Sequence, residues 1–181
     1  MDKKIKTIIL ISTFVFILTA GVLSLNYLSK IITPERIINE TNIKASDFTV
    51  TDINGAEVNL YDFIGKPVVL NFWASWCPPC KSEMPDFNKL FTEIDDVQFI
   101  MVCLTDGARE TVKTGSEYVR EQGYSFPIYF DTATQAANAF IVRSIPATFF
   151  IDSDGYIKRS EHGMINEEIL RDNIKLIREG E

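Results

Sequence analysis

Two cysteines three positions apart, in the segment Trp76-Cys-Pro-Pro-Cys80, are the residues of this sequence best suited to chemistry. They follow an apolar run expected to form a buried strand, and they begin a stretch expected to be a helix. Two cysteines on the first turn of a helix lie close enough to form a disulfide. Because a helix N-terminus stabilises a thiolate, Cys77, with its sulfur exposed, is the expected nucleophile. Cys80 is expected to turn inward and to resolve the mixed disulfide that Cys77 forms with another protein.

Other roles for a cysteine pair are weighed against the rest of the chain. A structural zinc site needs four ligands, but this chain has three cysteines and a single histidine, His162, with no second closely spaced pair. A structural disulfide is the other alternative, although a single pair at a strand–helix junction favours redox chemistry. The third cysteine, Cys103, falls in a predicted buried strand, where we expect an inert thiol.

Composition and charge exclude several classes of protein. Hydrophobic residues make up 46% of the chain and charged residues 24%, which is typical of a folded protein and excludes global disorder and fibrous repeats. The formal net charge of −7 leaves no basic surface to bind phosphates, so a nucleic-acid partner is excluded. The length of 181 residues suits one globular domain with an appendage.

The appendage is an apolar run from Ile8 to Leu25, in which no residue is charged. A helix of that length spans about 27 Å, enough for the hydrocarbon core of a bilayer. Lys3, Lys4 and Lys6 precede the run, which by the positive-inside rule places the N-terminus in the cytoplasm. We expect a signal-anchor, a single transmembrane helix that holds the domain on the extracytoplasmic face of the cell membrane. A cleaved signal peptide is the alternative; either one exports the domain to a place where a cysteine pair can stay oxidised.

Three regions follow from these patterns: the cytoplasmic N-terminus and anchor (1–28), a linker (29–44) and one domain (45–181). The domain opens with a predicted β-hairpin, because Asn54-Gly55 suits the positive φ angles of a tight turn. The expected strands are 48–52, 56–60, 67–73, 97–104, 125–130, 147–151 and 156–161. The expected helices are 78–91, 109–122, 132–140 and 167–178. This order predicts an α/β domain with a mixed sheet and helices on both faces.

The segment from Phe72 to Pro85, which reads FWASWCPPCKSEMP, resembles the active site of thioredoxin-like proteins. With the apolar anchor and Glu83, it is similar more narrowly to the TlpA/ResA group of membrane-anchored thiol-disulfide oxidoreductases. The resemblance extends over about residues 45–178 and implies a thioredoxin-like fold with the hairpin added at its N-terminal side. It also implies that Pro146 is a cis-proline facing the dithiol, so that the backbone of Ile145 can pair with an extended client segment. Trp76 is expected to shield the sulfur and to contact clients.

Glu83 lies one helical turn beyond Cys80 and can share its face of the helix. The resemblance favours a carboxylate that raises the thiol pKa and relays a proton during resolution, whereas an exposed surface acid is the alternative. Asn71 stands where thioredoxin has a buried Asp, so a relay has to use Glu83 or water. Pro78 and Pro79 lack N–H groups that could stabilise a thiolate at Cys77, which predicts a reducing protein.

The resemblance implies a reductase of disulfides in exported proteins, above all the CxxCH haem-attachment motifs of apocytochromes c. Electrons are expected from a membrane thiol transporter of the CcdA type, and no cofactor or metal is expected. Reduction for envelope or spore assembly and general disulfide oxidation are alternatives within this chemistry. A Sco-like copper chaperone that uses His162 is an alternative of another class, although the cysteine spacing and the position of the histidine both depart from that pattern.

Overall fold

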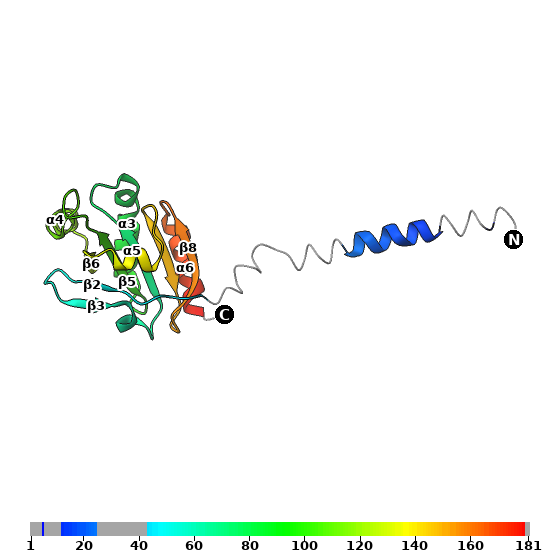
Figure 1. Ribbon diagram of the computed structural model, residues 1–181, viewed down its shortest axis with the longest axis horizontal. Coiled ribbons are helices and arrows are strands. Elements are labelled where there is room, and N and C mark those ends of the chain that lie inside the picture. Colours follow the sequence, from blue (N-terminus) through cyan, green and yellow to red (C-terminus); the bar gives the residue numbers. More distant parts are fainter. Residues whose placement is uncertain (1–4, 6–11, 25–42, 180–181) are drawn as a thin grey trace. The chain divides into compact units, whose positions relative to one another are not determined.

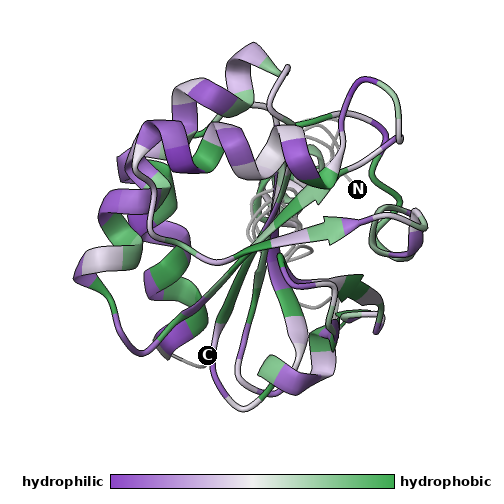
Figure 2. Ribbon diagram, turned by 90° about the vertical axis from the view of Figure 1, so that its left-hand side faces the viewer, coloured by the Kyte–Doolittle hydropathy of each residue, from purple (hydrophilic) through white to green (hydrophobic). Residues whose placement is uncertain are grey.

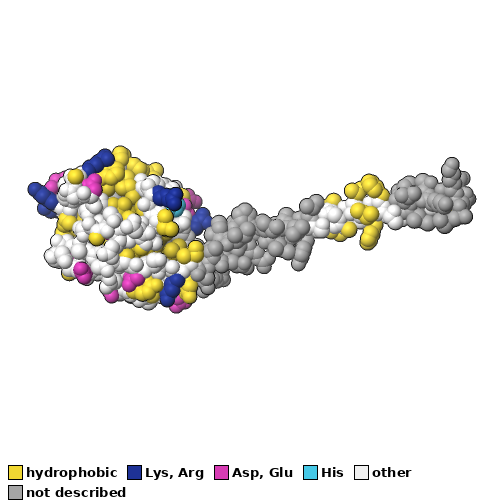
Figure 3. Space-filling model, viewed as in Figure 1, with side chains coloured by type: hydrophobic (Ala, Val, Ile, Leu, Met, Phe, Trp, Pro, Cys, Tyr) yellow, Lys and Arg dark blue, Asp and Glu magenta, His cyan; other side chains and the backbone are white. Residues whose placement is uncertain are grey.

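The computed structural model describes residue 5 and residues 12–24 and 43–179, and the chain divides into two units, 1–41 and 42–181. In the first unit residues 12–24 are helical, and their large hydrophobic side chains, such as Phe16 and Leu23, are exposed (Figures 1 and 3). Within the described residues, no helix combines the length and the apolar character needed to cross a membrane. Residues 8–11 and 25 of the predicted anchor, and nearly all of the predicted linker, lie outside the described residues.

The second unit is built on one mixed sheet of eight strands in the order β1-β8-β7-β4-β5-β6-β2-β3 (Figure 1). The central strand β4 pairs in parallel with β5 and antiparallel with β7, so that Asn71 faces Met101 on one side and Thr148 on the other. The strands are β1 (Ile43–Lys44), β2 (Thr49–Thr51), β3 (Glu57–Asn59), β4 (Val68–Trp73), β5 (Gln98–Leu104), β6 (Ile128–Asp131), β7 (Ala147–Ile151) and β8 (Tyr156–His162).

Helices cover both faces of this sheet, and their bounds are α3 (Pro78–Glu93), α4 (Val112–Gln122), α5 (Gln135–Ala139) and α6 (Glu167–Glu179), with the 3₁₀ turn η1 at Leu60–Phe63. Successive residues of β4 point to opposite faces, so Val69 and Trp73 pack in the core under α3, α4 and α6. Leu70 and Phe72 pack in the second core, under η1 and α5. Figure 2 accordingly shows mainly hydrophobic central strands and helices with both kinds of residue. The predicted α/β class with a mixed sheet is confirmed.

The predicted hairpin is present as β2 and β3, with Val50 opposite Val58. The carboxylate of Asp52 closes its turn by accepting hydrogen bonds from the backbone N–H groups of Asn54 and Ala56, both at 2.8 Å. Gly55 supplies the positive φ angle, at 82°. The hairpin joins the sheet through β2 and β6, and so extends the edge of the sheet away from the segment that carries the cysteines.

The structure differs from the sequence-based prediction at several element bounds: the strand predicted over 125–130 is Ile128–Asp131, and the helix predicted over 132–140 is Gln135–Ala139. Two further differences concern residues 43–44 and the start of α4. Residues 43 and 44, predicted as linker, form β1 and pair with the start of β8. The helix predicted from residue 109 begins at Val112, because the carboxylate of Asp106 accepts the N–H groups of residues 108, 109 and 110 and holds them in a loop. Thr111 then caps the helix by accepting the N–H of Thr114 at 3.1 Å.

Candidate active site

The cysteine pair lies where β4 ends and α3 begins. Cys77 is the N-cap residue of α3, in an extended conformation, and Pro78 and Pro79 are the first two helical residues. The two cysteines form a disulfide, with their Cα atoms 5.3 Å apart. The backbone N–H of Cys80 points to the sulfur of Cys77 at 3.3 Å, so a helix N-terminal donor faces this atom.

Both sulfurs lie inside the domain in this oxidised state. Cys80 is fully buried as expected, but the expectation of an exposed Cys77 sulfur is wrong, because only 2% of Cys77 is accessible. Its Sγ lies 3.8 Å from the carbonyl oxygen of Ile145, a separation at which a reduced thiol can donate a hydrogen bond. The loop before β7 therefore covers the sulfur of Cys77.

The covering loop contains a cis peptide bond between Ile145 and Pro146. The carbonyl oxygen of Pro146 accepts a hydrogen bond from the N–H of Gly163 at 2.9 Å, which anchors the loop to the end of β8. The loop thus brings Ile145 and Pro146 beside Cys77, although the three residues are far apart in the sequence.

The two tryptophans near the dithiol have different surroundings. Trp73 is fully buried in the core, and its indole N–H has no hydrogen-bond partner among the described residues. Trp76 is 38% exposed and offers part of its ring to solvent. The guanidinium carbon of Arg109 lies 3.8 Å from the centre of that ring, so a cation covers one of its faces. No sequence pattern indicated this pairing across 33 positions.

Glu83 is buried on the inner face of α3, the dithiol helix, with only 1% of its surface accessible, which rules out an exposed surface acid. One of its oxygens accepts a hydrogen bond from the side-chain amide of Asn71 at 2.8 Å, and the other accepts the N–H of Ile165 at 3.0 Å. Burial disfavours the charged form more than these two donors favour it, and it raises the pKa of Glu83 to about 7. The group can therefore exchange a proton near neutral pH.

Asn71 connects Glu83 to the sheet. Its amide nitrogen also donates to the hydroxyl of Thr148 at 3.0 Å, whereas its amide oxygen, also buried, has no partner among the described residues. Glu83 bonds directly to β4 and to the loop before α6, and through Asn71 it is linked to β7, so sequence spacing along α3 alone did not reveal Thr148 or Ile165.

The remaining cysteine and the histidine lie apart from this chemistry. Cys103 is a buried free thiol, and burial together with the nearby Glu110 raises its pKa. His162 is exposed at the end of β8, with its ring centre 6.0 Å from that of Phe149. In the described part of the chain, no group of three or more His, Cys, Asp or Glu side chains is arranged to bind a metal ion.

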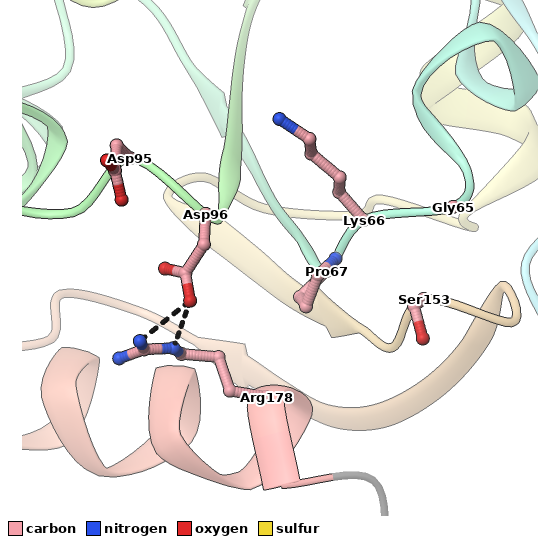
Figure 4. A pocket seen from close by; sticks show the side chains of 7 residues that line it. All are labelled: Gly65, Lys66, Pro67, Asp95, Asp96, Ser153 and Arg178. Carbon is pink, nitrogen blue, oxygen red and sulfur yellow. Dashed lines mark hydrogen bonds and ion pairs between the residues drawn. The ribbon is translucent and has the colours of Figure 1, made fainter.

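A surface pocket of about 450 Å³ lies at the opposite end of the sheet, before the starts of β4 and β5 (Figure 4). Its most prominent interaction is the ion pair between Arg178 of α6 and Asp96, at 2.7 Å. Lys66 extends away from this pair (Figure 4). The pair connects α6 to the loop before β5, and the pocket contains none of the residues of the dithiol site.

Comparison with known proteins fits this geometry. Residues 41–160 match the model of the AhpC/TSA family. The thiol-disulfide oxidoreductase ResA of Geobacillus thermodenitrificans is 34% identical over 136 residues, which cover 74% of this chain and 76% of that protein. This chain belongs to the AhpC/TSA family as a ResA-like thiol-disulfide oxidoreductase.

Solved structures extend the ResA-like match to the fold. StoA of Bacillus subtilis superimposes with a TM-score of 0.62 at 25% identity, covering 71% of this chain and 96% of StoA. The exposed lipoprotein thioredoxin Etrx1 of Streptococcus pneumoniae gives a TM-score of 0.62 at 27% identity, covering 72% of this chain and 99% of that protein. The ResA-like chain therefore has the thioredoxin-like fold, and the disulfide between Cys77 and Cys80 is the dithiol pair such an enzyme needs.

Proposed function

We propose that this ResA-like enzyme reduces disulfide bonds in exported proteins, with Cys77 as the nucleophile and Cys80 as the resolving thiol. The thiolate of Cys77 attacks a client disulfide, forms a mixed disulfide and displaces one client thiolate, which takes up a proton. Cys80 then attacks the sulfur of Cys77, releases the second client thiol and forms the Cys77–Cys80 disulfide. The client gains two electrons and the enzyme loses two. The position of Cys77 at the N-terminus of α3, beside the Ile145–Pro146 loop, is the observation that carries this proposal.

The sparse donors around the Cys77 sulfur support the reductive direction. The N2 and N3 amides of a helix normally point at the N-cap side chain, but the N2 residue here is Pro79, which has no N–H. Only the N–H of Cys80 donates to the sulfur among the described residues. A weakly stabilised thiolate makes the reduced form less stable, and the protein a better reductant.

The buried carboxyl group of Glu83 suits the resolving step. Cys80 has to lose a proton before it attacks, and Glu83, one turn further along α3, has its pKa raised to about 7 by burial. A carboxylate of that pKa can take the proton near neutral pH and return it later. A negative charge there also raises the pKa of a neighbouring thiol. We assign Glu83 this role of proton relay.

Client binding is assigned to Trp76 and to the Ile145–Pro146 loop. An extended client segment can pair in β fashion with the backbone of Ile145, which already lies within 3.8 Å of the Cys77 sulfur. The exposed part of Trp76, the residue directly before Cys77, offers apolar contact to a client.

We place the domain (45–181) on the extracytoplasmic face of the membrane, behind a linker (29–44) and a single signal-anchor in 1–28. The exposed hydrophobic side chains on the helix of residues 12–24 support a membrane location for this segment. One neighbour in fold, Etrx1, is an exposed lipoprotein, which agrees with an extracytoplasmic site of action. Apocytochrome c with its CxxCH disulfide is the proposed client, and a CcdA-type transporter is the proposed electron donor.

Trapping in cells tests this assignment. A full-length Cys80→Ala chain cannot resolve its mixed disulfide, so clients should stay bound to Cys77 until a reductant is added. A Cys77→Ala chain is the matched control and should trap nothing at that position. Recovery of apocytochromes c supports the proposal, whereas recovery of cell-wall or spore proteins alone would assign the enzyme to envelope assembly.

A further inference from the structure

Glu110 is a buried carboxylate that the redox chemistry does not use. It is fully buried, directly before the N-cap of α4, and no sequence pattern singled it out. One of its oxygens accepts both the N–H and the hydroxyl of Ser75, each at 2.7 Å. The other accepts the hydroxyl of Thr114 at 2.7 Å. Three donors, with at least one on each oxygen, make this carboxylate a hydrogen-bonded buried anchor.

This anchor joins the turn before the dithiol to the loop that follows β5. Ser75 directly precedes Trp76 and Cys77, whereas Glu110 is 35 positions further along the chain. The loop is itself closed, because the N–H groups of Asp106 and Gly107 both donate to the carbonyl oxygen of Glu110 at 3.1 Å. The side chain of Glu110 therefore fixes one rigid segment against another.

The joined segments bring Arg109 onto Trp76. Arg109 is the neighbour of Glu110, and its guanidinium lies 3.8 Å from the centre of the Trp76 ring. The side chain is exposed, and no group in the described part of the chain accepts a hydrogen bond from it. A stacked guanidinium keeps its N–H edge available for a carboxylate. Arg109 is thus an exposed cation with unused N–H donors, and it lies against Trp76, the residue before Cys77.

We propose that Glu110 is a positioning residue that presents Arg109 and Trp76 as one preformed contact for an acidic side chain beside the client's disulfide. The proposal rests on the disulfide reduction proposed above and names a chemical preference of that site. Preformation matters because a contact that is already ordered costs less entropy on binding. The net charge of the chain is −7, so an acidic client gains no long-range attraction, and the preference has to arise at this contact.

Single-turnover kinetics of the reduced full-length chain in mild detergent test the proposal. The probes are two peptides with one intramolecular disulfide each, identical except for Glu or Gln beside one cysteine, and the neutral bis(2-hydroxyethyl) disulfide. We expect the Glu peptide to react about fivefold faster than the Gln peptide, the size of effect that a partly exposed ion pair gives. Arg109→Gln and Glu110→Ala should both bring that ratio close to one, while the rate with the small disulfide changes less than twofold.

Two further variants separate positioning from stability. Glu110→Gln should keep most of the preference, because its amide oxygen can accept the Ser75 donors while the hydroxyl of Thr114 turns to accept from its amide nitrogen. Asp152→Asn is the matched control: its carboxylate is also buried and accepts two N–H groups, but it lies in the β7–β8 turn at the far end of the sheet. Asp152→Asn should leave the ratio unchanged.

The outcomes are distinct. An unchanged ratio in Arg109→Gln or in Glu110→Ala overturns the inference while the reductase function stands. If Glu110→Ala does not fold, Ser75→Ala, which loses one of the three donors, should give an intermediate ratio, and a ratio equal to that of the parent overturns the inference. A parent chain that reduces neither peptide nor the small disulfide contradicts the proposed function itself.

Discussion

Replacing Glu83 by Gln should change how the stability of the protein depends on pH. The carboxyl group has a folded-state pKa of about 7 and an ordinary value of 4.5 in the unfolded chain. Between these values the folded state keeps the proton that the unfolded state has lost. Glu83 therefore costs no unfolding free energy below pH 4.5, and the unfolding free energy falls as the pH rises from 4.5 to about 7. At 1.36 kcal/mol per pH unit, the loss amounts to about 3 kcal/mol. Glu83→Gln removes this loss.

The substitution fits the site. The introduced amide can keep one of the two acceptor positions of Glu83, and its nitrogen can donate to the oxygen of Asn71, which lacks a partner among the described residues, once the Asn71 amide turns over. Any loss of unfolding free energy caused by the amide's packing or hydrogen bonding does not depend on pH, so it cancels when two pH values are compared. The quantity that matters is therefore the difference between variant and parent at pH 8 compared with pH 4.

Chemical denaturation of the oxidised full-length chain in mild detergent, followed from pH 4 to pH 8, measures this quantity. We expect Glu83→Gln to gain about 3 kcal/mol relative to the parent over that range. Glu121→Gln is the control, since Glu121 is exposed near the end of α4 and its replacement should give parallel curves. Parallel curves for Glu83→Gln as well would show that folding does not raise the pKa of Glu83, and would refute its assignment as the proton relay.

Three further predictions follow from local contacts. Pro79→Ala introduces an N–H aimed at the sulfur of Cys77. One hydrogen bond of about 1.5 kcal/mol to the thiolate should raise the reduction potential by about 30 mV, measured by equilibration with glutathione. An unchanged potential would contradict the argument that the missing donor makes the protein reducing. Gly115→Ala places a methyl group 2.9 Å from the sulfur of Cys103 and should cost about 1–3 kcal/mol of unfolding free energy. A second change, Cys103→Ala, should recover part of this loss. Equal stability of all three chains would show that the surrounding core adjusts without cost. Asn166→Ala removes the N-cap of α6 and should lower the unfolding free energy by about 1 kcal/mol in urea, whereas no loss would mean that packing alone holds the helix start.

Much of the fold could be predicted from the sequence, because the patterns that indicate its strands, helices and turns lie within short segments. The run that became β4 is apolar at nearly every position, as a strand buried on both faces requires, and Asn54-Gly55 marked the hairpin turn. The cysteine pair located the chemistry for the same reason, since both sulfurs belong to one turn of one helix. The start of α4 was misplaced because a single side chain, Asp106, holds the preceding residues in a loop.

Only part of the site could be predicted from the sequence, because its remaining contacts join segments that are far apart along the chain. Spacing along α3 put Glu83 one turn from Cys80, but its burial depends on Asn71 and on the backbone of Ile165, 82 positions away. The covering of Cys77 depends on a loop 68 positions further along the chain. Contacts of this kind leave no periodic pattern in a single sequence.

The most direct test of the account is whether the sulfur of Cys77 exchanges partners with a protein disulfide. Reduced full-length parent, Cys77→Ser and Cys80→Ser chains are mixed with insulin, and the products are followed by mass spectrometry under non-reducing conditions. The account predicts that the parent releases reduced insulin chains, that Cys80→Ser accumulates a covalent adduct at Cys77, and that Cys77→Ser does neither. Reduction of insulin by Cys77→Ser at the parent's rate would contradict it.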